Sequence, residues 1–354
     1  LASNEQNVYC YAKALEAAAA NEDRGKDLMG LFLKRREDKF MITQKVVAAA
    51  ADNRKSGEEI MVVLLQEAAE RFEISAGLIV QIARWFDHGV MKLLLEQRGD
   101  EVRIIEEVVT AAARNLKDGR DVIALLLDRR GDEIKITEEK VVEAAAGNED
   151  NGRDVIALLL DRRGEEIKIT EQALAAAAKN DGSGREVMEL LLKQRGDEIK
   201  ITEKVLKAAA ENNGEGVMAL LLKERGDEIR ITEEVVKAAA GNVYQDVMAL
   251  LLKERGDEVK ITEEVLKVAV GYREAIGLLL QKLGDQLIIT EEVLKEAARD
   301  AGVMALLLEQ RGDEVKITEE VLKVAVTNQE VMELLLQQLG DQLKITEEVV
   351  MIAA

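Results

Sequence analysis

The sequence predicts an all-α solenoid, in which helix-turn-helix repeats of 28 to 33 residues stack on one another through short extended links. Three observations predict it. Segments like RGDEIKIT recur along the chain, proline is absent, and only 3% of the 354 residues are aromatic although 47% are hydrophobic. A core of Ala, Leu and Val side chains suits closely packed helices, and the missing proline removes the commonest helix breaker.

The repeat length follows from the last position of each RGDEIKIT-like segment, which is usually a threonine. These positions are Thr43, Ser75, Ile105, Thr137, Thr170, Thr202, Thr232, Thr262, Thr290, Thr318 and Thr346. One repeat is too small to bury its own apolar surface, so its stability must come from stacking. We predict a single repeat domain over 1–354, with about eleven full units over 11–346, the first helix of a twelfth over 347–354, and residues 1–10 as the start of an excised fragment.

The first helix of a unit is predicted by its start and stop signals. In the unit 233–262, Thr232 is placed to cap the helix 233–240, and glutamates fill the first turn, where the helix dipole favours negative charge. Gly and Asn follow the helix, which indicates a left-handed cap at its end.

The second helix is predicted over 245–255, because its apolar residues cover more than one face. Gly256 is expected to close it with another left-handed cap. The remaining DEVKIT is too short for a helix and is expected to form one extended link, with Val259 and Ile261 as inward anchors. Stacking would align Glu233, Glu263, Glu291 and Glu319 in an acidic ladder beside Lys237, Lys267, Lys295 and Lys323.

The run DVMALLLKERGDEVKITEEVVKAAAGN resembles the ankyrin repeat, with an outer helix, a Gly-containing turn, a Thr-started inner helix and a double Ala before a Gly or Asn. It departs in lacking Thr-Pro-Leu-His and the residues of the hairpin finger. LLLDRRGDEIKITEE is also similar to degenerate ankyrin-like arrays of fungal multidomain proteins, including nucleotide-binding, repeat-tailed receptors. This resemblance implies a recognition or assembly module of a larger protein.

Charge and composition argue against several partners. The formal net charge of -20 should repel phosphate backbones, so nucleic acid is not expected as a partner. No apolar run approaches the roughly 20 residues that cross a bilayer, so no membrane partner is expected. A single cysteine, Cys10, suits a reducing compartment, and we expect a cytoplasmic location.

The sequence contains no recognisable catalytic, cofactor or metal motif. His88 is the only histidine and Cys10 the only thiol, so a His-rich metal site cannot form and no catalytic triad is recognised. The Arg-Gly-Asp tripeptide of the repeats is replaced elsewhere by RGE or LGD, which a helix stop tolerates and an adhesion ligand would not. We therefore predict no enzyme, no cofactor and a structural role for this joint. A hydrolase using Asp132, Asp197 and Asp227 stays a less favoured alternative.

The irregular inter-helix loops carry the candidate binding residues. Ten residues past the threonine position the usual occupant is Asn, but Trp85, Tyr272 and Asp300 replace it in three units. Since Trp and Tyr are poor left-handed caps, they are either covers for the exposed end of the first helix or anchors for a partner. The predicted partner-binding residues are Trp85, Phe86, His88, Tyr244, Tyr272 and Arg273.

These observations favour a non-catalytic module that recognises another protein. A spacer or self-association module, whose regular faces stack on copies of themselves, is the alternative. The sequence does not identify the partner.

Overall fold

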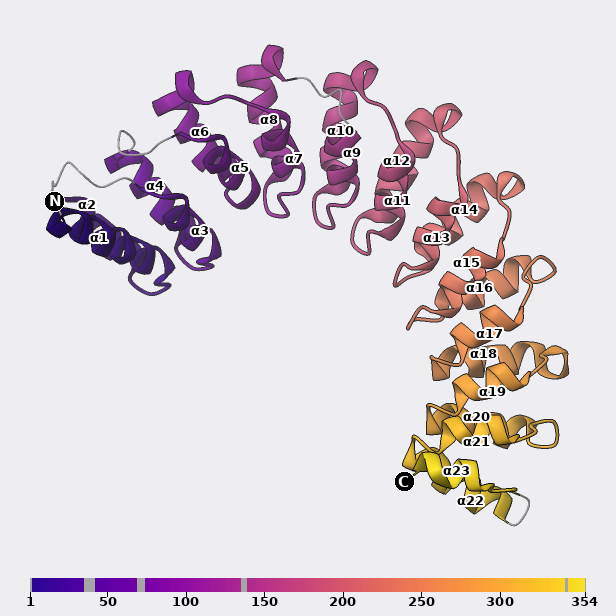
Figure 1. Cartoon of the computed structure of the whole chain (residues 1–354). Helices are drawn as coiled ribbons and strands as arrows, with labels where there is room; N and C mark the ends of the chain where they lie inside the picture. Colours follow the sequence, from indigo (N-terminus) through magenta and orange to yellow (C-terminus); the bar gives the residue numbers. More distant parts are fainter. Residues whose placement is uncertain (1, 35–41, 69–73, 135–138, 341–342, 354) are drawn as a thin grey trace. The chain divides into compact units, whose positions relative to one another are not determined.

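A computed structural model describes residues 2–34, 42–68, 74–134, 139–340 and 343–353 (Figure 1). In these ranges the chain consists of helices, turns and extended links. It divides into two compact units, Leu1–Ile199 and Lys200–Ala354. Each unit is a stack of helix pairs, as the repeat pattern predicts. The end of the RGDEIKIT segment at 135–137, including Thr137, lies outside the described residues.

Six helix pairs follow one another in the described part of the first unit. Their first helices are α1 (Ala2–Ala20), α3 (Gln44–Asp52), α5 (Ala76–Trp85), α7 (Glu106–Ala113), α9 (Glu139–Ala146) and α11 (Glu171–Lys179). Their second helices are α2 (Gly25–Lys34), α4 (Gly57–Ala68), α6 (His88–Arg98), α8 (Gly119–Arg130), α10 (Gly152–Arg163) and α12 (Gly184–Arg195). First helices pack on first helices and second helices on second helices, as α5 on α7 and α10 on α12 show.

The described part of the second unit holds five further pairs and one single helix. Its first helices are α13 (Glu203–Ala210), α15 (Glu233–Ala240), α17 (Glu263–Ala269), α19 (Glu291–Ala297), α21 (Glu319–Ala325) and α23 (Glu347–Ala353). Its second helices are α14 (Gly216–Arg225), α16 (Asp246–Arg255), α18 (Arg273–Leu283), α20 (Ala301–Arg311) and α22 (Gln329–Leu339). The helical repeat solenoid is thus confirmed, and the start of a twelfth unit is present as α23. Whether 1–354 behaves as one domain stays a prediction.

The first helix of the chain, α1, begins earlier than predicted. The sequence pattern starts the first unit near residue 11, but α1 begins at Ala2. Cys10, just before the predicted start of the first unit, therefore lies inside this helix and is exposed.

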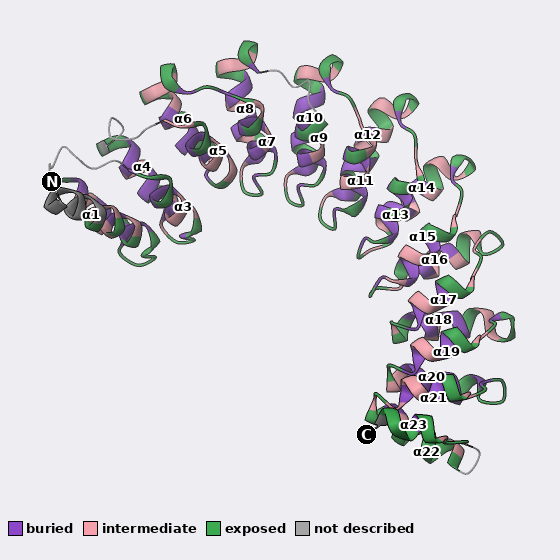
Figure 2. Cartoon of the chain, viewed as in Figure 1, coloured by how far each residue is buried: buried purple, intermediate pink, exposed green. Residues whose placement is uncertain are grey.

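The apolar faces of both helix layers are buried (Figure 2). In α15 Val235 and Ala239 are fully buried, and in α16 Met248 and Leu251 are fully buried. Burying a Val, Leu or Met side chain stabilises a fold by about 1.5 to 3 kcal/mol. Small residues on the first helix and large ones on the second fill the space between layers, so each repeat depends on its neighbours.

The joint between repeats is partly helical, which corrects the predicted extended link. After most second helices the Gly-Asp-Glu segment, or Gly-Glu-Glu in the case of η4, forms a 3-10 turn. These turns are η2 (Gly99–Glu101), η3 (Gly131–Glu133), η4 (Gly164–Glu166), η5 (Gly196–Glu198), η6 (Gly226–Glu228) and, with Gln in place of Glu, η7 (Gly284–Gln286). The next residue is extended and buried, as at Ile167, which is 2% exposed. A single inward anchor therefore follows the 3-10 turn in these repeats, whereas the predicted anchors Val259 and Ile261 are themselves only half-buried.

The arginine of the Arg-Gly-Asp joint binds the preceding repeat. Arg130 donates to the carbonyl oxygen of Gly99 at 2.9 Å and to that of Val102 at 3.1 Å. It also donates to the Glu133 carboxylate at 2.7 Å. The same three contacts are made by Arg195 and Arg255. The structural role predicted for this tripeptide is confirmed, because its arginine is already bound.

Buried asparagines join the ends of successive first helices. The Asn148 amide nitrogen donates to the carbonyl oxygens of Ala113 at 2.9 Å and Asn115 at 3.0 Å, both in the preceding repeat. Its Oδ1 accepts the backbone N–H groups of Asp150 and Asn151. Side chains that bridge in this way occur at Asn53, Asn115, Asn148, Asn180 and Asn242, which together form the asparagine ladder.

The predicted left-handed caps at these helix ends are wrong. Among the described residues, only Gly284 and Gly340 have positive φ, 48° and 47°. Both follow a leucine that replaces the arginine of the joint. Asn180 is instead extended, with φ −77° and ψ 110°. The asparagines recur because their side chains bond two repeats, and not because their backbone tolerates a left-handed conformation.

A second set of side-chain bonds joins the starts of the first helices. Thr262 accepts the Val265 N–H at 3.3 Å as the predicted cap and donates to Glu233 of the preceding repeat at 2.7 Å. Lys237 pairs with Glu234 at 3.0 Å and with Glu233 at 3.6 Å. The Thr-to-Glu bond recurs from Thr318 to Glu291 and from Thr346 to Glu319. Hydroxyl donors therefore hold part of the predicted acidic ladder in place.

The joint carboxylates give the array a pH-dependent contribution to stability. The Arg130 hydrogen bond lowers the pKa of Glu133 from its ordinary value of 4.5. Since the pKa is depressed on folding, this stabilisation is present above pH 4.5 and is lost as the pH falls through and below that value. We expect Glu133→Gln to lower the unfolding temperature slightly at pH 7, and thermal scans should show this difference closing between pH 5 and pH 3. A constant difference at all pH values would contradict a role for the charge.

In the described residues, no helix has the length and apolar character to cross a membrane.

Candidate functional site

The asparagine ladder changes in the repeat that contains α5 and α6. There the Asn115 amide reaches back to the carbonyl oxygens of Ala83 at 3.0 Å and Phe86 at 2.8 Å. Phe86 thus takes the place that Asn115 has relative to Asn148. Its ring is only 1% exposed, so it belongs to the core. The prediction of Phe86 as a partner contact is therefore wrong for this structure.

Trp85 is the last residue of α5 and remains on the surface. Its side chain is 54% exposed, and the Arg84 guanidinium lies over the ring at 4.9 Å from its centre. The ring forms part of a groove of about 410 Å³ between α5 and α7. We call it the Trp85 groove, and its lining includes Gln81, Arg84, Trp85, Thr110, Arg114 and Lys140.

Two arginines of the Trp85 groove lack acidic partners. Neither Arg84 nor Arg114 forms an ion pair with any residue that the structure describes. Burial lowers the pKa of Arg84, and the neighbouring charge of Arg114 lowers it further. Both arginines also line an adjacent hollow of about 290 Å³ over α9. Glu107 lines the groove too, so it carries both signs of charge.

Two polar atoms of the Trp85 groove are buried without a hydrogen-bond partner among the described residues. They are Oε1 of Gln81, on α5, and Oγ1 of Thr110, on α7. Leaving such an atom unsatisfied costs about 1 to 3 kcal/mol, so a polar ligand would be favoured if these two side chains turned toward the groove.

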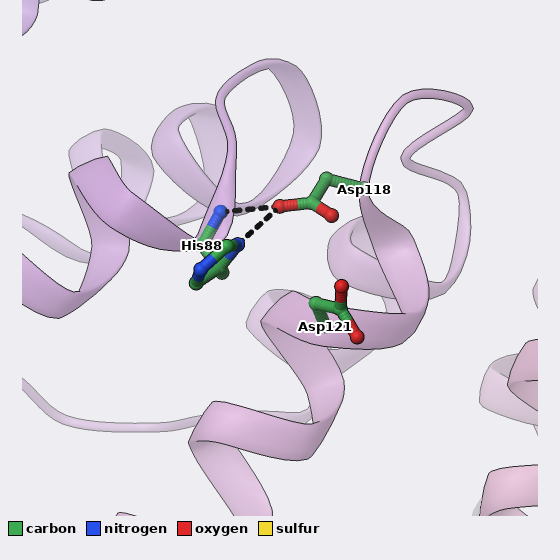
Figure 3. A group of neighbouring side chains, drawn as sticks. All are labelled: His88, Asp118 and Asp121. Atoms are coloured by element: carbon green, nitrogen blue, oxygen red, sulfur yellow. Dashed lines mark hydrogen bonds and ion pairs between the residues drawn. The ribbon is translucent and has the colours of Figure 1, made fainter.

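His88 is brought against two carboxylates by the next repeat (Figure 3). Its ring Nδ1 lies 2.8 Å from Oδ2 of Asp118, and its backbone N–H donates to the same oxygen at 2.7 Å. Asp121, one turn further along α8, places an oxygen so that all three ligand atoms lie within 4.8 Å of one another. The hydrogen bond to Asp118 raises the pKa of His88 above 6.5, and burial opposes this shift.

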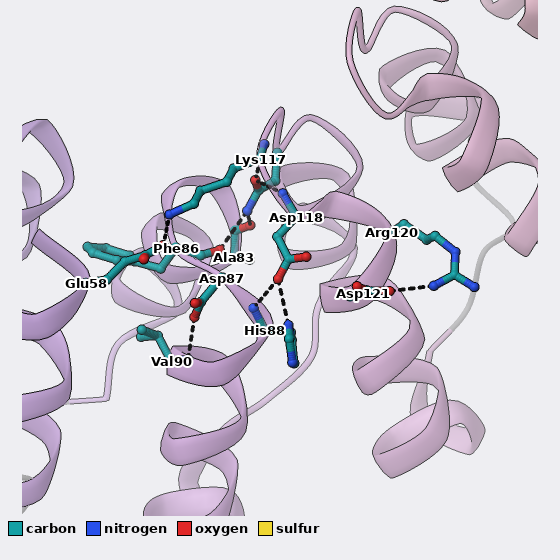
Figure 4. Close-up of polar contacts among 11 residues, drawn as sticks. Glu58, Ala83, Phe86, Asp87, His88, Val90, Lys117, Asp118, Arg120 and Asp121 are labelled. Carbon is teal, nitrogen blue, oxygen red and sulfur yellow. Dashed lines mark hydrogen bonds and ion pairs between the residues drawn. The ribbon is translucent and has the colours of Figure 1, made fainter. Parts of the chain in front are cut away.

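The surroundings of His88 hold both loops in place (Figure 4). Asp87 caps α6 by accepting the Val90 N–H at 2.9 Å. Lys117 pairs with Glu58, which links the next loop to α4. Arg120 pairs with Asp121 at 2.5 Å.

The remaining predicted residues lie in the second unit. Tyr244 is 55% exposed in the loop between α15 and α16. Tyr272 precedes α18 with φ −135° and is half-buried, and Arg273 is the exposed first residue of that helix. Trp85 and Tyr272 were singled out as poor left-handed caps. Neither residue has a positive φ, so that reason for choosing them is wrong.

Sequence reasoning found Trp85 and missed the groove around it. Arg84 and Arg114 are 30 residues apart, which is one repeat length, so a search for cations in register on consecutive first helices would have paired them. It also missed Asp118 and Asp121, because metal sites were sought as a group of histidines or as one compact loop of oxygen ligands, and not across two repeats. His88 belongs to one repeat and the two carboxylates to the next, so their proximity is apparent only in the folded structure.

A family model described as Domain of unknown function (DUF7104) matches eleven segments of the chain. They are residues 13–29, 31–61, 93–122, 125–155, 158–188, 190–218, 220–248, 250–274, 278–303, 306–332 and 334–354. These segments cover well over half of the sequence. The chain belongs to the DUF7104 family.

The tandem DUF7104 matches confirm the repeat array, but they do not support the predicted resemblance to ankyrin arrays. A search of curated proteins gave no significant match.

One part of the chain departs from the DUF7104 pattern. No match covers residues 62–92, which contain α5, Trp85, Phe86 and His88. The candidate site therefore lies in the repeat whose sequence differs most visibly from the family pattern. The matches on either side show that the array continues around it.

Proposed function

We propose that the chain is a non-catalytic scaffold that binds an extended, acidic segment of another protein in the Trp85 groove. The observation that carries this proposal is the half-exposed Trp85 ring beside two arginines that lack acidic partners. Tryptophan and arginine are the residue types most enriched where binding energy concentrates in protein interfaces.

The groove offers three kinds of contact to such a segment. The Trp85 ring offers an apolar platform for a side chain. Gln81 and Thr110 have hydrogen-bonding atoms without partners among the described residues, and rotation of these side chains toward the groove would let them bind a peptide backbone. A carboxylate between Arg84 and Arg114 would offset the repulsion of two neighbouring guanidinium groups and form charge-assisted hydrogen bonds with them.

A protein suits this groove better than a nucleic acid does. The chain carries 69 acidic and 49 basic residues, so its long-range field repels a polyanion. Two local arginines are enough for one or two carboxylates, and not for a phosphate backbone. The resemblance of the repeat motif to fungal ankyrin-like arrays, which are recognition modules, is in keeping with the same proposal, and we propose a cytoplasmic location with it.

A displayed library of random 12-residue peptides, selected on the wild-type chain, tests the proposal. We expect enrichment of peptides with an aromatic or aliphatic residue near Asp or Glu. Trp85→Ala should weaken the best peptide at least tenfold, or by about 1.4 kcal/mol, as measured by fluorescence anisotropy. Arg114→Glu should weaken it as well, and salt should reduce wild-type binding.

Matched controls separate the groove from the general surface. Tyr244→Ala removes an equally exposed aromatic ring from the second unit, and Arg153→Ala removes an exposed arginine of α10. Both should bind the peptide like the wild type. If Trp85→Ala binds as tightly as Tyr244→Ala, the proposal fails. Light scattering over a range of concentrations tests the self-association alternative, which requires the mass to rise with concentration.

A further inference from the structure

We propose that His88, Asp118 and Asp121 form a binding site for a divalent transition-metal ion, with Zn²⁺ as the ion tested, between two neighbouring repeats. This site is separate from the Trp85 groove and does not depend on the function proposed for it. It holds the only imidazole of the chain.

The ligand atoms belong to rigid elements. His88 is the first residue of α6, Asp118 precedes α8 directly, and Asp121 lies in the first turn of α8. Two of the three ligand atoms, His88 Nδ1 and Asp118 Oδ2, are already 2.8 Å apart, and all three lie within 4.8 Å. Zinc binds imidazole nitrogen and carboxylate oxygen at about 2.0 to 2.2 Å, so modest side-chain rotations bring the three atoms around one ion.

The chemistry of the three side chains selects the class of ion. One imidazole and two carboxylates suit zinc and its neighbours in the transition series better than Ca²⁺ or Mg²⁺, which prefer oxygen ligands alone. The site is open to solvent, since the His88 side chain is 53% exposed, so water can complete the coordination. Three protein ligands with open positions are the arrangement of zinc sites that keep bound water.

A simple ion pair between His88 and Asp118 is the alternative to a metal site, but it does not explain why Asp121 lies beside them. Asp121 holds a carboxylate oxygen within 4.8 Å of both other ligand atoms, and Arg120 pairs with the same carboxylate (Figure 4). The next repeat provides a comparison, because α10 has the same sequence as α8, GRDVIALLLDRR, and Asp154 holds the place of Asp121. There Asn151 stands in place of Asp118, and no histidine is available. Asp154 is therefore a matched control that keeps the helix and loses the site.

Zinc titration of the full chain against a chromophoric zinc chelator tests the site. We expect about one Zn²⁺ per chain to bind with the highest affinity. His88→Ala and Asp121→Asn should each weaken zinc binding at least tenfold. Removing a residue that only hydrogen-bonds to a metal ligand already costs about tenfold or more in metal affinity. Asp154→Asn should bind zinc like the wild type. Cu²⁺ bound at the same site should show coupling to one imidazole nitrogen in its electron paramagnetic resonance spectrum, and His88→Ala should lose that coupling.

Two results would overturn the proposal. Equal zinc binding by wild type and His88→Ala would show that the acidic surface binds the ion without the imidazole. Equal weakening by Asp154→Asn and Asp121→Asn would show that any carboxylate in this position suffices. Circular dichroism of each variant checks its fold, and His88→Gln, which keeps a side chain of similar size without the ring, takes the place of His88→Ala if that variant does not fold.

Discussion

Asn148→Ala lowers the free energy of unfolding around the central repeats of the first unit by about 2 to 4 kcal/mol. The substitution leaves the buried carbonyl oxygens of Ala113 and Asn115 without their donor, and each such loss costs about 1 to 3 kcal/mol. It also removes the acceptor for two N–H groups of its own loop. Because repeat arrays can unfold in parts, the measurement is hydrogen–deuterium exchange of α7 to α10, supported by urea unfolding.

Asn148→Asp separates the two halves of this role. Aspartate keeps oxygen acceptors for the loop N–H groups, but it faces the two carbonyl oxygens of the preceding repeat with a negative charge. We expect it to be at least as destabilising as Asn148→Ala at pH 7. Because the protonated acid can donate to a carbonyl oxygen, its stability relative to wild type should recover as the pH falls. Wild-type exchange rates in Asn148→Asp at pH 7 would show that the bridge between repeats contributes nothing.

Local signals predicted the elements of the fold well. The first helix Glu233–Ala240 was predicted with its observed bounds, because its Thr cap, first-turn glutamates and alanine run all lie within nine residues. The second helix was predicted to within one residue, since it ends at an Arg-Gly pair. Its glycine was expected to be left-handed, but Gly256 has φ −52° and continues the right-handed turn.

Contacts between repeats were less predictable, because they join residues about 30 positions apart. Nothing local to Arg130 indicates that it binds Gly99, and nothing local to Asn148 indicates that it binds Ala113. In both cases the sequence showed that a residue type recurs and suggested a local cause. The recurrence had a different origin, which is satisfaction of the backbone of the neighbouring repeat.

The same distinction applies to the candidate sites. Trp85 was found because it interrupts a pattern, whereas Phe86, its neighbour, was predicted beside it and is buried. Whether an irregular residue faces solvent or the core depends on the packing of α5 against α7, which the pattern does not encode. The regular ladders hold the two loops in register, and irregular residues on such a scaffold are where binding is expected.

Gly184→Ala destabilises the first unit by about 1 to 3 kcal/mol, although alanine is the better helix former by about 1 kcal/mol. Gly184 is the buried first residue of α12, and a Cβ there would lie 2.3 Å from the carbonyl oxygen of Ala177 and 3.0 Å from Cβ of Asn180. No backbone or side chain can approach that closely, so α12 must move away from α11. Urea unfolding followed by circular dichroism measures the loss.

Gly164→Ala makes the same chemical change at the end of the preceding second helix and should have the opposite sign. Gly164 has φ −52° and ψ −39°, which alanine adopts freely, and a Cβ there meets no atom within 4 Å. Restricting the unfolded chain should therefore stabilise the protein by about 0.4 to 1 kcal/mol. Since helix propensity favours alanine at both places, only the close approach of α12 to α11 can reverse the sign. If both variants are stabilised, α12 does not need a glycine at Gly184 to pack against α11. That result would also mean that the contact does not position the neighbouring ladder residue Asn180.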